Sequence, residues 1–90
     1  MYSKQTKIIN RSGLHARPAS DFVIQAKKFE SKITIRKLNA ESDAVNAKSI
    51  VRILAEGFSI DTEIEISADG SDEINAVDCL VAMVESGFGE

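Results

Sequence analysis

The chain has 90 residues, of which 43% are hydrophobic and 28% charged, and this favours one soluble globular domain over residues 1–90. Its short apolar runs exclude a membrane span, its first ten residues lack a signal peptide core, and its one cysteine excludes an internal disulfide, so we expect a cytoplasmic protein. All eleven Lys and Arg lie before residue 53, where the chain has only four Asp and Glu, and the other ten Asp and Glu follow. This uneven charge distribution favours binding to an acidic partner over binding to nucleic acid.

The first part of the chain predicts a strand, a helix and a second strand. Residues 2–8 alternate weakly, as in a strand, and a loop follows at Asn10 to Gly13. Apolar residues then recur at helical spacing, and Pro18 fits a first helical turn, so we expect a helix from about Ala16 to Lys28. Residues 32–36 alternate as a second strand with one face in water.

The second part predicts two more strands and two more helices. A polar loop, Asn39 to Asp43, precedes a short strand around Val45. Ser49 and Gly57 then stand where an N-cap and a C′ glycine would bound a helix over residues 50–56. Residues 62–68 alternate as a fourth strand, residues 69–71 form a turn, and a last helix ends at Gly87. The apolar stripe of that helix is Val77, Leu80, Val81 and Val84.

The order β-α-β-β-α-β-α predicts an α+β two-layer sandwich, with the helices packed on one face of the sheet. Strands that alternate, rather than form continuous apolar runs, indicate that the other sheet face meets water. We find no repeat, linker or low-complexity segment that would divide the chain.

The chemistry is expected at His15, the single histidine of the chain, which directly precedes the first predicted helix. A helix N-terminus offers unpaired N–H groups and a positive dipole end to an anion, and Arg17 adds a guanidinium suited to phosphate oxygens. An imidazole is a competent nucleophile near neutral pH, so this segment could hold a transferred phosphoryl group. The residues alone leave open that His15 is an ordinary loop histidine. A metal site and a hydrolase triad are not expected.

Three segments resemble one family. Residues 13–19 are Gly13-Leu14-His15-Ala16-Arg17-Pro18-Ala19, which resembles the phosphorylation-site signature of HPr, the phosphocarrier of the bacterial phosphoenolpyruvate-dependent sugar phosphotransferase system. Residues 46–50, Asn46-Ala47-Lys48-Ser49-Ile50, are similar to the segment with the regulatory serine of many Gram-positive HPr proteins. The tail from Glu85 to Glu90 is also similar. The resemblance implies an open-faced, mainly antiparallel four-stranded sheet with three helices on one face.

The resemblance also implies roles. Enzyme I, charged by phosphoenolpyruvate, would phosphorylate His15 on Nδ1, and the group would pass to an enzyme IIA domain without any cofactor. Ala16 and Arg17 would bind the phosphate. Ser49 would be the target of an ATP-dependent HPr kinase/phosphorylase, a role compatible with its place as a helix N-cap. The protein would then be a carrier and not an independent enzyme.

A docking surface is predicted on the second helix. Ile50, Val51, Ile53 and Leu54 spread over nearly half of its circumference, so part of them should stay exposed and bind partners. The alternative is that all four pack inward. In the HPr family this helix, beside the histidine, contacts partners. The expected interface residues are Ser20, Lys48, Ile50, Val51, Arg52 and Leu54. The implied partners are Enzyme I, enzyme IIA domains, the kinase/phosphorylase and a transcriptional regulator. We expect the protein to be a monomer that binds neither nucleic acid nor a membrane.

Some residues depart from the family pattern. Arg52 and Glu56 stand where many Gram-positive HPr proteins have a glycine and an apolar residue, and Leu38 to Ala44 is longer than the usual turn. These departures bear on partner choice and kinase recognition. Two other functions therefore stay open: an HPr-like regulatory paralogue of nitrogen or catabolite-repression type, and a basic nucleic-acid module, which would bind DNA or RNA in a salt-sensitive way.

Overall fold

A computed structural model describes residues 1–38 and 43–90, so the predicted loop Asn39 to Asp43 and the longer turn Leu38 to Ala44 lie largely outside the described residues. The elements occur in the predicted order. They are β1 (Tyr2–Lys7), α1 (Ala16–Ala26), β2 (Lys32–Lys37), β3 (Val45–Asn46), α2 (Ile50–Glu56), β4 (Glu63–Asp69), α3 (Glu73–Glu85) and a final 3₁₀ turn (Gly87–Gly89). No helix among them is long and apolar enough to cross a bilayer.

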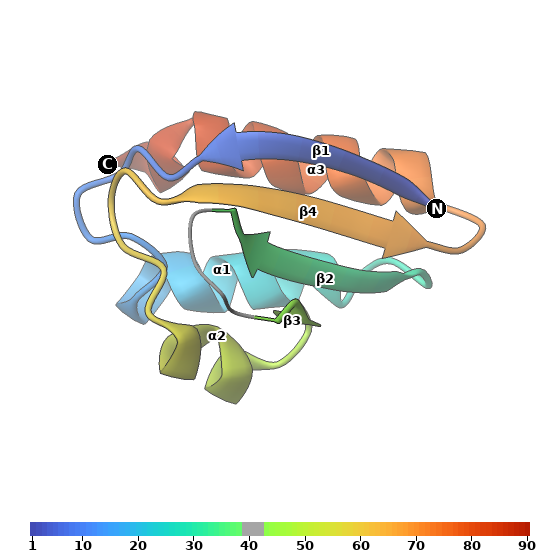
Figure 1. Ribbon diagram of the computed structural model, residues 1–90, viewed down its shortest axis with the longest axis horizontal. Helices are drawn as coiled ribbons and strands as arrows, with labels where there is room; N and C mark the ends of the chain where they lie inside the picture. Colours follow the sequence, from blue (N-terminus) through green and yellow to red (C-terminus); the bar gives the residue numbers. More distant parts are fainter. Residues whose placement is uncertain (39–42) are drawn as a thin grey trace.

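The described strands form one antiparallel sheet in the order β1-β4-β2-β3. β4 lies in the middle, with Ile66 opposite Lys4 of β1 on one side and opposite Ile35 of β2 on the other. Figure 1 shows the sheet in front, with α1 and α3 behind it on a single face. This arrangement confirms the predicted α+β open-faced two-layer sandwich.

Alternation in β2 and β4 decides which sheet face meets the helices. Ile64, Ile66 and Ala68 of β4 are buried, whereas Glu65 and Ser67 between them point to the open face and are partly exposed. The same rule places Ile33 and Ile35 of β2 in the core. The helices complete this core with the buried residues Ala19, Phe22, Val23, Ala26, Ile53, Ala76, Val77, Leu80, Val81 and Val84.

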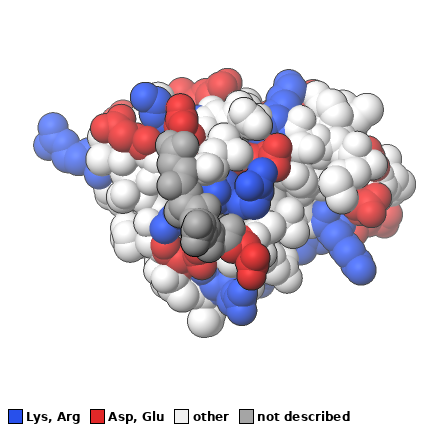
Figure 2. Space-filling view, viewed as in Figure 1, with Lys and Arg blue, Asp and Glu red and all other residues white. Residues whose placement is uncertain are grey.

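The basic first part and the acidic second part of the sequence meet across the sheet. The Arg36 guanidinium lies 2.9 Å from the Glu65 carboxylate, and the Lys4 ammonium lies 2.8 Å from Asp78 of α3. Figure 2 shows Lys and Arg interspersed with Asp and Glu on the face viewed in Figure 1. Antiparallel pairing of early strands with a late one therefore mixes charges that are separated in the sequence.

The helix ends follow local hydrogen bonding. α2 has the predicted caps, because the Ser49 hydroxyl accepts from the Arg52 N–H at 3.3 Å and Gly57 adopts the left-handed conformation, with φ of 70°. α1 ends at Ala26, two residues before the predicted Lys28. Its last turn tightens, since the Lys28 N–H bonds three residues back to the Gln25 carbonyl instead of four.

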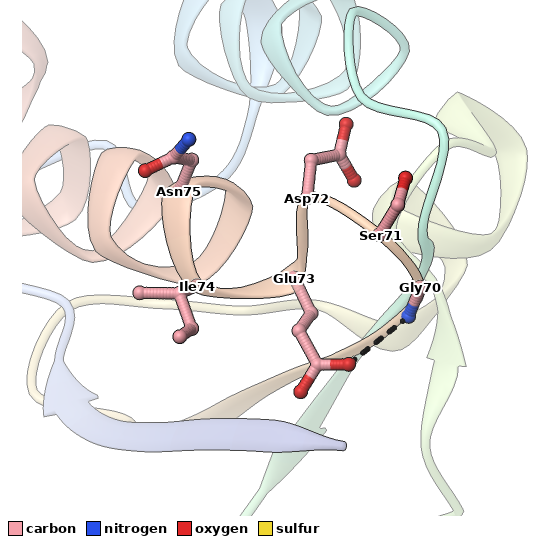
Figure 3. Close-up of a pocket in the computed structure, with 6 residues that line it drawn as sticks. All are labelled: Gly70, Ser71, Asp72, Glu73, Ile74 and Asn75. Carbon is pink, nitrogen blue, oxygen red and sulfur yellow. Dashed lines mark hydrogen bonds between the residues drawn. The ribbon is translucent and has the colours of Figure 1, made fainter.

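The turn into α3 encloses a hollow lined by Gly70, Ser71, Asp72, Glu73, Ile74 and Asn75 (Figure 3). Its polar groups serve the fold. The Glu73 carboxylate accepts from the Gly70 N–H at 3.3 Å, and the Asp72 carboxylate accepts from the N–H groups of Glu30 and Ser31 at 2.8 and 3.0 Å. The Ser31 hydroxyl also donates to Asp72 and is the main reason that the pKa of that carboxyl is lowered. The hydrogen bonds of Asp72 therefore join the start of α3 to the residues that lead into β2.

Candidate functional site

The loop before His15 is fixed by a buried asparagine. Asn10 is 3% exposed, its side-chain Nδ2 donates to the Gly13 carbonyl at 2.9 Å, and its own carbonyl accepts from the Gly13 N–H at 3.1 Å. The Leu14 N–H then donates to the Phe58 carbonyl at 2.8 Å, and the Leu14 side chain is fully buried. These hydrogen bonds fix the residues just before His15 and attach them to the segment that follows α2.

Glycine is required at position 13 of this loop. Gly13 has φ of +64°, in the left-handed region that favours glycine. A Cβ at this position would lie 2.4 Å from the Phe58 carbonyl oxygen, which is closer than non-bonded atoms approach. The glycine of the signature thus allows the loop to pack against the backbone at Phe58, and this contact sets the start of α1.

His15 is the N-cap residue of α1. Its backbone is extended, with φ of −128° and ψ of 161°, and its carbonyl accepts from the Ala19 N–H at 3.5 Å. The side chain is exposed, and within residues 1–38 and 43–90 it makes no capping hydrogen bond. The next residue, Ala16, has φ of +48°, a conformation that costs a residue with a Cβ about 1 kcal/mol. The imidazole is therefore presented to solvent at a sharp entry into the helix.

The first turn of α1 supplies donors for an anion at His15. The N–H groups of Ala16 and Arg17 lie at the start of the helix, where an α-helix provides no acceptor for them, and they contribute to its positive end. The Arg17 side chain is 90% exposed, and its Nε lies 3.9 Å from Asp21, one turn further along the same helix. Such an exposed pair contributes little to stability, so the guanidinium is free to change partners.

A hollow of about 340 Å³ lies beside Arg17 and is lined by Arg17, Pro18, Asp21, Phe88, Gly89 and Glu90. Phe88 and Gly89 of the C-terminal tail, which both line this hollow, have positive φ values of 54° and 81°. The Glu90 carboxylate accepts from the Ser12 hydroxyl at 2.5 Å and from the Ser12 N–H at 3.2 Å. The pKa of the Glu90 carboxyl is lowered, mainly because the Ser12 hydroxyl donates a hydrogen bond to it.

Sequence reasoning missed three residues of this region. Asp21 could have been found, because it stands four residues after Arg17 on a predicted helix, the spacing of an ion pair. Asn10 gave the weaker signal of a turn residue. Glu90 gave no signal, because its partner Ser12 is 78 residues away in the sequence.

α2 leaves part of its apolar surface exposed, as predicted. Ile53 is fully buried and Ile50 is partly buried, whereas Val51 and Leu54 are 71% and 43% exposed. The alternative that all four residues pack inward is therefore wrong. Arg52 on the same helix is also exposed.

The predicted interface residues lie at two ends of the helix pair. α1 and α2 contact each other, and the Leu14–Phe58 hydrogen bond brings the C-terminal end of α2 to the His15 loop (Figure 1). Ser20 is exposed on α1. Lys48 instead donates through Nζ to the Phe29 carbonyl at 2.7 Å, just beyond the C-terminal end of α1. Lys48 and the adjacent Ser49 therefore lie at the end of the pair away from His15.

Comparison with known proteins gives consistent matches. A family model described as "PTS HPr component phosphorylation site" matches residues 2–86. Phosphocarrier protein HPr of Haemophilus influenzae is 43% identical over 84 residues, which cover 93% of this chain and 95% of that protein. The multiphosphoryl transfer protein of the same organism is 41% identical over 83 residues, 92% of this chain, but the chain spans only 17% of that relative's length.

Solved structures agree with these relatives. The crystal structure of HPr-C-His from Thermoanaerobacter tengcongensis has a TM-score of 0.93 at 46% identity, covering 100% of this chain and 98% of that one. Two relatives with other names also match. Phosphocarrier protein NPr of Proteus mirabilis is 37% identical over 97% of this chain and 94% of its own. Crh of Bacillus subtilis is 33% identical, with a TM-score of 0.73 and 97% coverage of both chains.

Proposed function

Because the chain belongs to the HPr family of phosphocarrier proteins of the phosphotransferase system, we propose that it carries a phosphoryl group on His15. The group would come from Enzyme I charged by phosphoenolpyruvate and would pass to an enzyme IIA domain in the cytoplasm. The observation that supports this most is the exposed imidazole of His15, which makes no capping hydrogen bond among the described residues and lies at a helix N-terminus beside Arg17.

In the proposed step, the lone pair on Nδ1 of the neutral His15 imidazole attacks the phosphorus of phospho-Enzyme I. A P–N bond forms as the bond from phosphorus to the donor atom breaks, and the donor atom keeps that electron pair. The Nε2 proton stays on the ring. The N–H groups of Ala16 and Arg17 and the Arg17 guanidinium stabilise the phosphoryl oxygens, and the reverse attack by an enzyme IIA nucleophile removes the group. The protein is thus a carrier that makes no product of its own.

Replacing Arg17 with alanine should slow transfer without unfolding the protein. Arg17 is 90% exposed and pairs with Asp21 at 3.9 Å, so stability should change by less than about 0.5 kcal/mol. Loss of a charge-assisted hydrogen bond to the phosphate should slow transfer about 10- to 100-fold. Stopped-flow transfer from Enzyme I and thermal unfolding measure the two effects. Unchanged transfer rates in both directions would refute this role for Arg17.

The carrier role is tested by reconstituting the relay. Enzyme I, labelled phosphoenolpyruvate and a purified enzyme IIA domain are incubated with and without the chain. The IIA domain should become labelled faster when the chain is added than when it is left out. Equal labelling of the IIA domain without it, or label that enters the chain and never leaves it, would contradict a carrier.

Partners are proposed to dock on α2 and the start of α1. The exposed Val51 and Leu54, with Ile50, Arg52 and Ser20 around them, form this surface, whereas Lys48 lies at its far end. An apolar patch beside the reacting group suits partners that must bring their own reactive residue to His15. The described strands all pair within one chain, which supports a monomer as the working form.

Ser49 is proposed as a regulatory site for an HPr kinase/phosphorylase. Its hydroxyl caps α2, and a phosphate there would add nearly two negative charges at the docking helix and repel an acidic partner. Ser49→Asp should therefore slow the Enzyme I reaction by about fivefold at low salt, and added salt should relieve the effect. Ser49→Asn, which caps equally well without charge, is the control. Equal rates for the two variants would leave Ser49 as a helix cap only.

A regulatory paralogue is the second candidate, favoured by the NPr and Crh relatives. Such a protein would act through partner binding, including binding to a transcriptional regulator, instead of through sugar uptake. Competition between a sugar-specific and a nitrogen-type IIA domain for phosphoryl groups from the chain distinguishes the two. Faster transfer to the sugar-specific domain supports the sugar carrier, and faster transfer to the other supports the paralogue.

A further inference from the structure

We propose that Ile9 and Ile60 form a second apolar contact surface for the phosphoryl donor, Enzyme I, separate from the exposed residues of α2. The inference rests on the proposed function and extends its docking surface to two loops that meet at the end of the sheet. It assigns the two isoleucines to binding and not to the chemical step.

The two side chains stay exposed beside each other. Ile9 follows β1 and is 53% exposed, and Ile60 precedes β4 and is 45% exposed. Both line one hollow of about 520 Å³. The backbone holds their loops together, because the Asp61 N–H donates to the Ile8 carbonyl at 2.7 Å. A single exposed isoleucine is ordinary on a protein surface, whereas two that share a hollow form a surface that a partner can cover.

This hollow adjoins the surroundings of His15. Glu90 lines both this hollow and the one beside Arg17. The segment that leads to Ile60 also packs against Gly13, so closely that a Cβ at that glycine would lie 2.9 Å from the Cα of the residue before Ile60. The apolar pair is therefore continuous with the place where phosphoryl transfer is proposed.

The end of the molecule that presents His15 is small compared with a typical protein interface. Figure 1 shows the loop between β1 and α1, the segment between α2 and β4, and the C-terminus together at one end of the long axis. The molecule measures 29 by 21 Å across that axis. A standard interface buries about 800 Å² on each partner, equivalent to a disc roughly 32 Å wide. An interface of that size centred on His15 would cover the exposed residues of α2 and also the hollow of Ile9 and Ile60.

Enzyme I suits this surface better than a second copy of the chain. A copy seated on the hollow would cover the neighbouring His15 and block transfer, whereas the donor must bring its own reactive residue to that position. The isoleucines carry no group that stabilises charge on the phosphoryl oxygens, so they contact the donor equally before and during transfer. Contacts of this kind hold the complex together without lowering the barrier.

The double variant Ile9→Thr/Ile60→Thr tests this surface. Threonine keeps the branched Cβ and its backbone preference while it replaces apolar surface with a hydroxyl. Initial rates of phosphorylation by Enzyme I are measured against the concentration of the chain. KM for the chain should rise about five- to twentyfold, with kcat within about twofold of wild type. The rise should persist at high salt, because salt screens charges and not apolar contacts.

Two control variants separate this surface from general effects. Ile74→Thr makes the same change at an isoleucine that is 57% exposed at the start of α3, at the opposite end of the molecule (Figure 1), and it should keep the wild-type KM. Ile9→Val/Ile60→Val keeps the surface apolar and should return KM close to wild type. Ile60→Thr alone should raise KM in the same direction, and it changes a residue outside every described helix and strand.

The possible results separate the inference from the proposed function. An unchanged KM for the threonine double variant, or an equal rise in Ile74→Thr, overturns the inference and leaves the carrier role intact. Sedimentation that shows wild type as a dimer and the double variant as a monomer, with KM unchanged, would assign the hollow to a second copy and also overturn it. Failure of Enzyme I to phosphorylate wild type overturns the proposed function and the inference with it.

Discussion

His15→Ala is expected to reduce phosphoenolpyruvate-dependent labelling of the chain to background while the fold stays intact. The sequence contains no second histidine that could take over. The His15 side chain is exposed and makes no capping hydrogen bond among the described residues, so its removal should change the free energy of unfolding by less than about 0.5 kcal/mol. Labelling by Enzyme I and thermal unfolding measure the two quantities.

Arg11→Ala is a suitable control for this variant, because Arg11 is an exposed residue of the same loop. It should retain labelling. Wild-type labelling of His15→Ala would show that another residue accepts the group and would remove the basis of the proposed carrier role.

Leu54→Glu is expected to weaken binding to Enzyme I and to an enzyme IIA domain together. Leu54 is 43% exposed on α2 and lies in the half of the helix nearer the His15 loop. A charge there removes an apolar contact and repels an acidic partner, and loss of a central contact of this kind weakens binding about 30-fold or more. Calorimetric titration of both partners measures the change in Kd.

Ile74→Glu provides the matched control, because Ile74 is 57% exposed on α3, in the hollow of Figure 3 and away from α2. It should bind both partners like wild type. Equal loss of binding in the two variants would indicate a general charge effect. NMR titrations that shift signals of α3 but not of α2 would place the docking surface elsewhere.

Local patterns were enough to predict most of the fold. Alternation in residues 63–69 reflects a strand with one buried face, and the same rule identified β2. Ser49 and Gly57 bound α2 because a hydroxyl acceptor and a left-handed glycine satisfy the ends of a helix with groups close in sequence. His15 and Arg17 were proposed as site residues on the same kind of local signal, since they lie at a helix start that the neighbouring residues define.

Contacts between distant parts of the chain were not predictable in this way. The Phe58 carbonyl that fixes Leu14 and the Glu90 carboxylate that binds Ser12 come from segments far along the sequence. No local pattern specifies which of many polar groups will meet. The sequence shows that basic residues come first and acidic residues come later. The pairing of β1 and β2 with β4 then brings the two kinds of charge together in space, so the separation is lost in the folded molecule. Lys48 likewise binds the Phe29 carbonyl because the helices pack antiparallel.

Incubation of the wild-type chain with Enzyme I and radiolabelled phosphoenolpyruvate tests phosphoryl transfer to His15 most directly. The label should reach one phosphoryl group per chain, fall in the peptide that contains His15, survive alkali and be lost in brief acid, as a P–N bond requires. Label that survives acid, that maps to another peptide, or that fails to enter the chain at all would contradict the proposed carrier function.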